Sequence, residues 1–126
     1  MRVLGLGSGG REHAMVHALA GSPSVDALFA APGNPGMAIA AELLDLDISE
    51  SSGLAAAASK LEIDLTVVGP EAPLADGVGD VFAERGLRLF GPTAAGAELE
   101  ASKAFAKEFC FRHRIPTAAA EIVSTA

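Results

Sequence analysis

The sequence has one cysteine, few basic residues and no long apolar run, and each shortage argues against a class of protein. A single cysteine, Cys110, cannot form an internal disulfide, and its helical setting favours a buried thiol in a reducing compartment. The absence of any run of about eighteen apolar residues argues against a membrane-spanning segment. Polar and charged side chains at positions 11–13 interrupt any signal-peptide core. We therefore expect a cytoplasmic protein.

Basic side chains are scarce, with nine Lys and Arg against sixteen Asp and Glu, so the net charge is −7. Nucleic acids and membrane surfaces both require clustered basic residues, and neither is expected as a partner. The charge is uneven. Residues 1–100 carry five basic and fourteen acidic side chains, whereas residues 101–126 carry four basic and two acidic ones. The C-terminal segment is therefore a separate electrostatic region.

With 126 residues, half of them hydrophobic, the chain is long enough for one domain with a substantial core. Short apolar runs alternate with helical patterns. The runs that predict strands cover residues 2–6, 25–31, 43–48, 63–68 and 87–90. The helical patterns cover residues 11–20, 54–61, 73–86, 93–100 and 102–113, with Ser102 as a plausible N-cap. This alternation predicts an α/β fold, a doubly wound parallel sheet of about five strands.

Gly5 lies near the end of the first predicted strand, and Gly7 and Gly10 lie between that strand and the first predicted helix. We call residues 7–11 the glycine loop. Glycines allow close backbone approach, and a helix N-terminus favours an anion, so the loop predicts a phosphate site; a tight turn without a ligand is the alternative. Irregular segments at 32–36 and 69–73 follow the second and fourth strands. In a parallel sheet all three loops should meet at one edge.

A nicotinamide dinucleotide site is the first hypothesis that this glycine spacing raises. Such a site needs an acidic residue at the carboxyl end of the second strand, where it binds the ribose 2′-hydroxyl. That strand ends at Phe29-Ala30-Ala31-Pro32, and Asp26 lies at its other end. The sequence therefore argues against a dinucleotide-dependent dehydrogenase.

Five segments, in order, resemble the N-terminal part of the phosphoribosylamine–glycine ligase family of ATP-grasp enzymes. They are residues 7–14, 32–36, 67–74 (followed by Gly77 and Asp80), 90–92 and 99–107. The resemblance spans essentially the whole chain. Gly5 and Ala101 depart from the pattern, where an aliphatic residue and a glycine are expected, and neither lies in the proposed chemistry.

The resemblance implies a ligase of purine biosynthesis that joins glycine to 5-phosphoribosylamine and cleaves ATP, with magnesium or manganese, through a glycyl phosphate intermediate. It places the central ATP-grasp lid, the magnesium-binding carboxylates and the glycine pocket beyond Ala126, so we expect an inactive fragment without a tightly bound cofactor. Residues 1–100 would form the Rossmann-like phosphoribosyl-binding domain, and residues 101–126 a helical lead-in to the ATP-grasp domain. The alternatives are a non-catalytic phosphoribosyl or nucleotide-binding module and the leading domain of another ATP-grasp carboxylate–amine ligase.

The resemblance and the chemistry together assign the substrate 5′-phosphate to backbone N–H groups of the glycine loop. The loop residues are Gly7, Ser8, Gly9, Gly10 and Arg11. Arg11 also brings a positive charge, although a surface salt bridge with Glu12 explains it equally well.

Three further residues receive roles, each with a plain alternative. Glu71 is expected to accept hydrogen bonds from the ribose hydroxyls, or to favour the N-terminus of the next helix. Asn34 is expected to add a polar contact to the ribose, or to occupy a left-handed turn. By the resemblance, Lys103 contacts the ATP phosphates; otherwise it is an exposed helix charge, as we expect Lys107 to be.

Two pairs of side chains receive no functional role. His13 and His17 are four residues apart on a helix, but no third ligand is spaced to complete a metal site. Phe105 and Phe109 are expected to be ordinary core residues.

Overall fold

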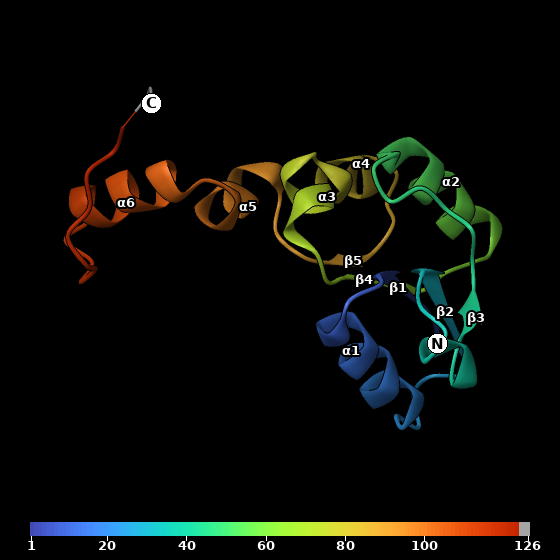
Figure 1. Ribbon diagram of the computed structural model, residues 1–126. Helices are drawn as coiled ribbons and strands as arrows, with labels where there is room; N and C mark the ends of the chain where they lie inside the picture. The colour runs from blue at the N-terminus through green and yellow to red at the C-terminus, as the bar shows by residue number, and fades with distance from the viewer. Residues whose placement is uncertain (124–126) are drawn as a thin grey trace.

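The computed structural model describes residues 1–123, and within them a five-stranded parallel sheet forms the centre of the fold (Figure 1). The strands are β1 (Arg2–Gly7), β2 (Ala27–Pro32), β3 (Glu42–Leu43), β4 (Leu65–Val68) and β5 (Leu89–Phe90). Their spatial order is β3-β2-β1-β4-β5, so the strand order reverses beside β1. The predicted doubly wound parallel sheet is confirmed, and its switch point lies where β1 and β4 end.

Helices cover both faces of the sheet. They are α1 (Gly10–Ala20), the 3₁₀ helix η1 (Met37–Ile39), α2 (Ser51–Lys60), α3 (Glu71–Ala75), α4 (Val78–Glu84), α5 (Ala94–Ala101) and α6 (Lys103–Arg112). Figure 1 shows α1 on one side of the sheet and α2, α3 and α4 on the other. On the α1 side, Val16 and Met37 pack in one buried cluster with Val3. On the other side, Leu54 and Phe82 pack with Leu4 and Leu6 of β1. Burial on both faces explains why β1 carries no polar side chain after Arg2.

Two elements differ from the sequence prediction. The helix predicted over residues 73–86 is divided into α3 and α4, because Gly77 between them has a left-handed φ of +89°. The strand predicted over residues 43–48 is only Glu42–Leu43. Beyond it, the Asp47 carboxylate accepts hydrogen bonds from the Ser49 N–H (2.9 Å) and Oγ (2.7 Å). Before this turn, the Leu44 N–H still donates to the Ala30 carbonyl of β2 at 2.8 Å, and the chain then bends as the Leu46 N–H donates to the Leu44 carbonyl at 3.0 Å. The bend and the turn together take the chain away from β2.

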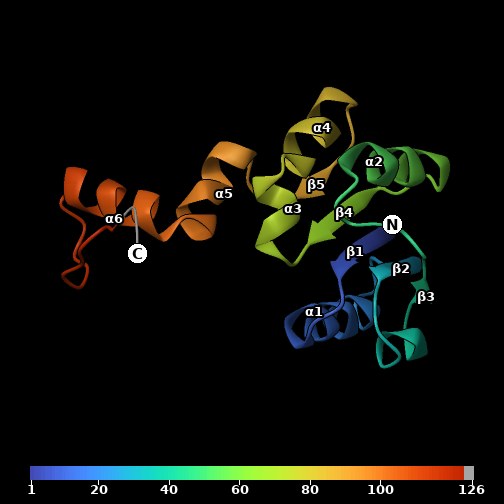
Figure 2. The same cartoon turned by 45° about the horizontal axis from the view of Figure 1, so that its top comes forward.

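The last two helices lead away from the sheet (Figures 1 and 2). α5 packs on α3 and α4, and α6 packs mainly on α5. The predicted cap is confirmed, since the Phe105 N–H donates to Ser102 Oγ at 3.2 Å. Phe105 and Phe109 are only half-buried, with ring centroids 6.3 Å apart, and within residues 1–123 no side chain of α6 is buried. The expectation that both phenylalanines belong to the core is therefore wrong. The domain boundary at residue 100 stays a prediction.

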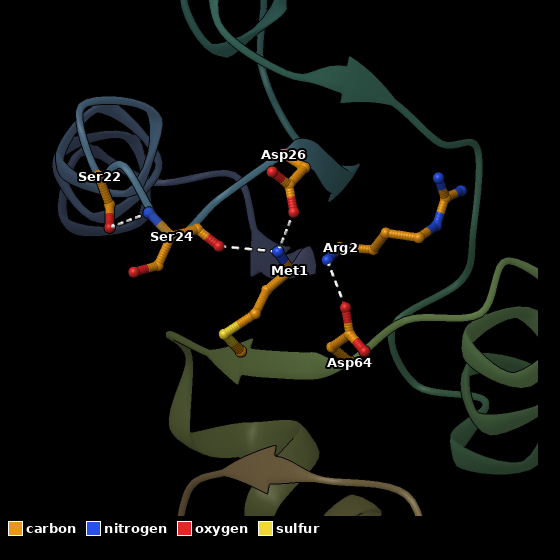
Figure 3. Close-up of polar contacts among 6 residues, drawn as sticks. All are labelled: Met1, Arg2, Ser22, Ser24, Asp26 and Asp64. Atoms are coloured by element: carbon orange, nitrogen blue, oxygen red, sulfur yellow. Dashed lines mark hydrogen bonds and ion pairs between the residues drawn. The ribbon is translucent and has the colours of Figure 1, made fainter.

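Polar contacts hold the amino ends of the strands together (Figure 3). The Met1 ammonium donates to the Ser24 carbonyl at 2.7 Å and to the Asp26 carboxylate, and the Arg2 N–H donates to Asp64 Oδ2 at 2.6 Å. The hydrogen bond from the Met1 ammonium lowers the pKa of Asp26. Asp26 thus lies at the edge opposite the glycine loop, as the argument against a dinucleotide site requires.

None of the helices in the described part of the chain has the length and apolar character that a membrane crossing needs.

Candidate functional site

The three irregular loops meet at the carboxyl edge of the sheet, as the topology predicts. The Asn34 amide Nδ2, in the loop after β2, donates to the carbonyl of Ser8 in the glycine loop at 2.9 Å. Arg11, in the glycine loop, lies with its guanidinium 3.7 Å from the carboxylate of Glu71, which follows β4. The glycine loop therefore contacts both of its neighbours at the switch point of the sheet.

The glycine loop ends β1 and begins α1, and its residues from Ser8 to Arg11 are exposed. Gly9 is the N-cap of α1 and donates its N–H to Glu12 Oε2 at 2.8 Å. The N–H groups of Ser8, Gly10 and Arg11 have no acceptor among residues 1–123. Unpaired N–H groups at the positive end of an eleven-residue helix are a favourable environment for an anion.

Glu12 lies beneath this exposed loop and is 9% exposed. Its side chain occupies space that glycines leave open on two sides. A methyl group built on Gly7 would lie 2.5 Å from Glu12 Cγ, and one on Gly69 only 2.2 Å from the same atom. Gly7 also has a φ of +119°, which L side chains rarely adopt. Two of the glycines at this edge are thus required by Glu12 itself, in addition to any ligand.

Both oxygens of the Glu12 carboxylate accept hydrogen bonds. Oε2 accepts from the Gly9 N–H, and Oε1 accepts from Arg11 Nε at 2.9 Å. Burial raises the pKa of Glu12, but the hydrogen bonds from Arg11 and Gly9 outweigh it, and the net pKa is lowered. The hydrogen bond to Glu12 in turn raises the pKa of Arg11. The expected ion pair exists, but it joins an exposed guanidinium to a buried, ionised carboxylate, so it is not a surface salt bridge.

Glu71 is the first residue of α3, and its side chain is 50% exposed beside Arg11. This position suits both expected roles, because the carboxylate favours the helix N-terminus and also faces solvent at the switch point. The ribose contact stays a prediction.

The family description "Phosphoribosylglycinamide synthetase, N domain" matches residues 1–100.

This chain belongs to the phosphoribosylglycinamide synthetase N-domain family.

Curated relatives of this family include the phosphoribosylamine–glycine ligase of Vibrio parahaemolyticus, which is 54% identical over 121 residues. The enzyme of that name from Pseudomonas aeruginosa is 55% identical over 121 residues. Each alignment covers 94% of this chain and 28% of the relative, so the chain spans little more than a quarter of their length.

Solved structures agree with the fold. The crystal structure of phosphoribosylamine–glycine ligase from Thermotoga maritima has a TM-score of 0.67 at 29% identity, covering 94% of this chain and 26% of that one. A Mycobacterium tuberculosis structure, described as glycinamide-RNase-transformylase T, has a TM-score of 0.73 at 23% identity. It covers 94% of this chain and 37% of that one, and at this identity it supports the fold alone.

The side chain of Asn34 has a structural role in this family member that the sequence did not predict. Its Oδ1 accepts from the N–H groups of Gly36 (2.9 Å) and Met37 (3.1 Å), while Nδ2 donates to Ser8. The left-handed conformation belongs to Gly33, with a φ of +70°, so that alternative for Asn34 is wrong. Both the oxygen and the nitrogen of the Asn34 side chain are hydrogen-bonded to backbone groups, so Asn34 connects the loop after β2 to the glycine loop. Its contact with the ribose stays a prediction.

The two lysines of α6 lie apart from the glycine loop. Lys103 is exposed at the first turn of α6, and both views place that helix away from the sheet (Figures 1 and 2). Its contact with ATP stays a prediction. Lys107 Nζ donates to Thr117 Oγ1 and to the Ala118 carbonyl, both at 2.7 Å. The expectation that Lys107 is merely a solvated charge is wrong, because it holds the following segment against the helix.

Sequence reasoning missed Glu12 as a structural part of the site. The signal was present, since a glutamate three residues after an N-cap commonly accepts the N-cap N–H.

His13 and His17 line a cavity between α1 and η1 together with Met37 and Ile39. No cluster of three metal-binding side chains occurs in the part of the chain that the structure describes.

Proposed function

We propose that this chain is the phosphoribosyl-holding N-terminal part of an ATP-dependent ligase that joins glycine to 5-phosphoribosylamine in purine biosynthesis. The names of the relatives support this activity, and the chain's coverage of only 28% of their length supports its being one part of a longer enzyme. One observation carries the substrate role. The N–H groups of Ser8, Gly10 and Arg11, unpaired within residues 1–123, lie at the switch point beside Glu71.

In this proposal the substrate phosphate binds at the start of α1. The N–H groups of Ser8, Gly10 and Arg11 donate to its oxygens, and the Arg11 guanidinium adds a positive charge. Gly9 shapes the loop without donating to the ligand, because its N–H is bound to Glu12. Gly7 supplies the backbone turn at the end of β1. Glu71 accepts hydrogen bonds from the ribose hydroxyls, so the sugar lies between the two loops.

The full ligase would use ATP and a divalent metal such as magnesium, which activate the carboxylate of glycine. The described residues supply no metal-binding cluster, so we assign no metal step to this chain. We propose Lys103 as the residue of this chain that contacts the ATP phosphates once the rest of the enzyme is present. The proposed compartment is the cytoplasm, where the single thiol of Cys110 would stay reduced.

Calorimetric titration of the 126-residue chain with glycinamide ribonucleotide tests the substrate role. We expect binding that is lost when the same compound lacks its phosphate, because the loop donates to phosphate oxygens. Glu71→Gln should weaken binding about tenfold, since an amide has one acceptor oxygen instead of two. Glu84→Gln, the same change at an exposed carboxylate of α4, should bind like the wild type. Equal affinity for the phosphorylated and unphosphorylated compounds would refute the proposal.

A further inference from the structure

We infer that Glu12 is a positioning residue, whose buried carboxylate fixes the glycine loop in the conformation that leaves the N–H groups of Ser8, Gly10 and Arg11 available to an anion. The ligand side of this inference rests on the proposed function. The loop conformation itself is a property of the free chain.

The first observation is that Glu12 uses both carboxylate oxygens within the loop. Oε2 accepts the N–H of Gly9 at 2.8 Å, and Oε1 accepts Nε of Arg11 at 2.9 Å. The bond to Gly9 takes one N–H group of the loop and leaves its neighbours unpaired. The ion pair with Arg11 balances the negative charge of the carboxylate. It also holds Nε of Arg11 in place, so that the other end of the guanidinium lies 3.7 Å from the Glu71 carboxylate. One side chain therefore sets both the backbone and the charge of the loop.

The second observation is that Glu12 touches the loop after β4 as well. Its Cγ and Oε1 occupy the space beside Gly69, where a methyl group would approach them to 2.2 Å and 2.5 Å. On the other side it fills the space beside Gly7. Glu12 is thus packed between the loop proposed for the phosphate and the loop that carries Glu71. A displacement of Glu12 would alter the spacing of both.

Two substitutions separate the effect of side-chain length at position 12 from the effect of its negative charge. Glu12→Asp keeps the charge but is one methylene too short to reach the Gly9 N–H from the same backbone position. Glu12→Gln keeps the length and one acceptor oxygen, so it can retain the bond to Gly9 while losing the ion pair with Arg11. If Glu12 acts by positioning, Asp should be the more damaging change. If only its charge matters, Asp should behave like the wild type.

Amide hydrogen exchange of the free chain tests the loop conformation without a ligand. In the wild type, the Gly9 amide should exchange at least about tenfold more slowly than the Ser8 and Gly10 amides, relative to their intrinsic rates, because it alone is hydrogen-bonded. Glu12→Asp should remove this protection, and Glu12→Gln should retain part of it. The matched control, Glu84→Gln, should leave all three amides unchanged. Similar rates for Gly9 and its neighbours in the wild type would overturn the inference.

Titration with glycinamide ribonucleotide tests the consequence for binding. We expect the dissociation constant to rise in the order wild type, Glu12→Gln, Glu12→Asp, with Asp at least about tenfold weaker, a change of about 1.4 kcal/mol. Far-ultraviolet circular dichroism confirms that each variant is folded. Wild-type affinity in a folded Asp variant would overturn the positioning role. If the wild type binds nothing, the proposed function fails, and the exchange rates still decide whether Glu12 fixes the loop.

Discussion

Gly69→Ala perturbs the packing beneath the glycine loop with a single methyl group. The added carbon would lie 2.2 Å from Glu12 Cγ and 2.7 Å from Cδ, well inside normal contact distances, so the Glu12 side chain must move. Moving it weakens the bonds to Gly9 and Arg11, and the bond from the Gly9 N–H to the buried, charged carboxylate contributes about 1.5–3 kcal/mol. With partial relaxation, we expect the free energy of unfolding to fall by about 2–4 kcal/mol.

Urea unfolding followed by far-ultraviolet circular dichroism is the suitable assay, because the sequence has neither tryptophan nor tyrosine for fluorescence. The midpoint should fall while the slope against urea stays unchanged, since the exposed surface is the same. Gly10→Ala is the matched control. A methyl group there meets nothing within 4 Å, and replacing a helical glycine should stabilise the chain by about 0.5–1 kcal/mol.

A double-mutant cycle identifies the cause of the loss. Glu12→Ala removes the three atoms nearest to the methyl group of Gly69→Ala, so in that background most of the cost of Gly69→Ala should disappear. A change within about 0.5 kcal/mol for Gly69→Ala alone would refute the account of Glu12 as a tightly packed side chain. An equal cost in both backgrounds would show that the destabilisation comes from somewhere else.

Three further predictions concern stability and use the same unfolding assay. The folded-state pKa of Glu12 lies below its ordinary value of 4.5, so its contribution is complete above pH 4.5 and is lost as the pH falls through the lowered pKa. Wild-type stability should therefore fall more steeply than that of Glu12→Gln in this acidic range; parallel curves would contradict the prediction. Asp80→Ala removes the carboxylate that accepts the Ala94 N–H at 2.9 Å, and it should cost about 1 kcal/mol; an unchanged midpoint would show that this contact adds nothing. Phe82→Ala leaves a cavity at a fully buried position (0% exposed) and should lower the free energy of unfolding by about 3–5 kcal/mol. Phe111→Ala, at a 52% exposed position, should lower it by less than about 1 kcal/mol. Equal losses at the two phenylalanines would contradict the assigned core.

The sequence predicts most of this fold because its local patterns agree with the tertiary structure. The apolar runs of β1 and β4 are nearly continuous, interrupted only by Arg2 at the start of β1 and by Thr66 in β4, as is typical of central parallel strands buried on both faces. The errors occur where a single residue overrides the pattern. Gly77 divides a continuous helical pattern through its backbone conformation. A bend at Leu44–Leu46, followed by the turn at Asp47, ends a strand that the apolar residues there favour. Neither effect shows in hydrophobic periodicity.

The site was predictable at the level of loops and less so at the level of side chains. The topology rule alone brings three loops to one edge. The contacts of Asn34 and the burial of Glu12 depend on distances between residues far apart in the sequence, such as Glu12 and Gly69. A charged run at positions 11–13 favours a surface assignment, and only the spacing from the N-cap indicates otherwise. In α6, Phe105 and Phe109 follow a core-like spacing, but only α5 lies against that helix to a substantial extent.

The central claim is that the glycine loop binds the phosphate of a phosphoribosyl ligand. Mapping of amide chemical shifts in the ¹⁵N-labelled chain during titration with glycinamide ribonucleotide tests it most directly. The account predicts the largest changes at Ser8, Gly10 and Arg11, a smaller change at Glu71, and none at Lys103. Saturable changes confined to α6, or to the cavity between α1 and η1, with the glycine loop unaffected, would contradict it.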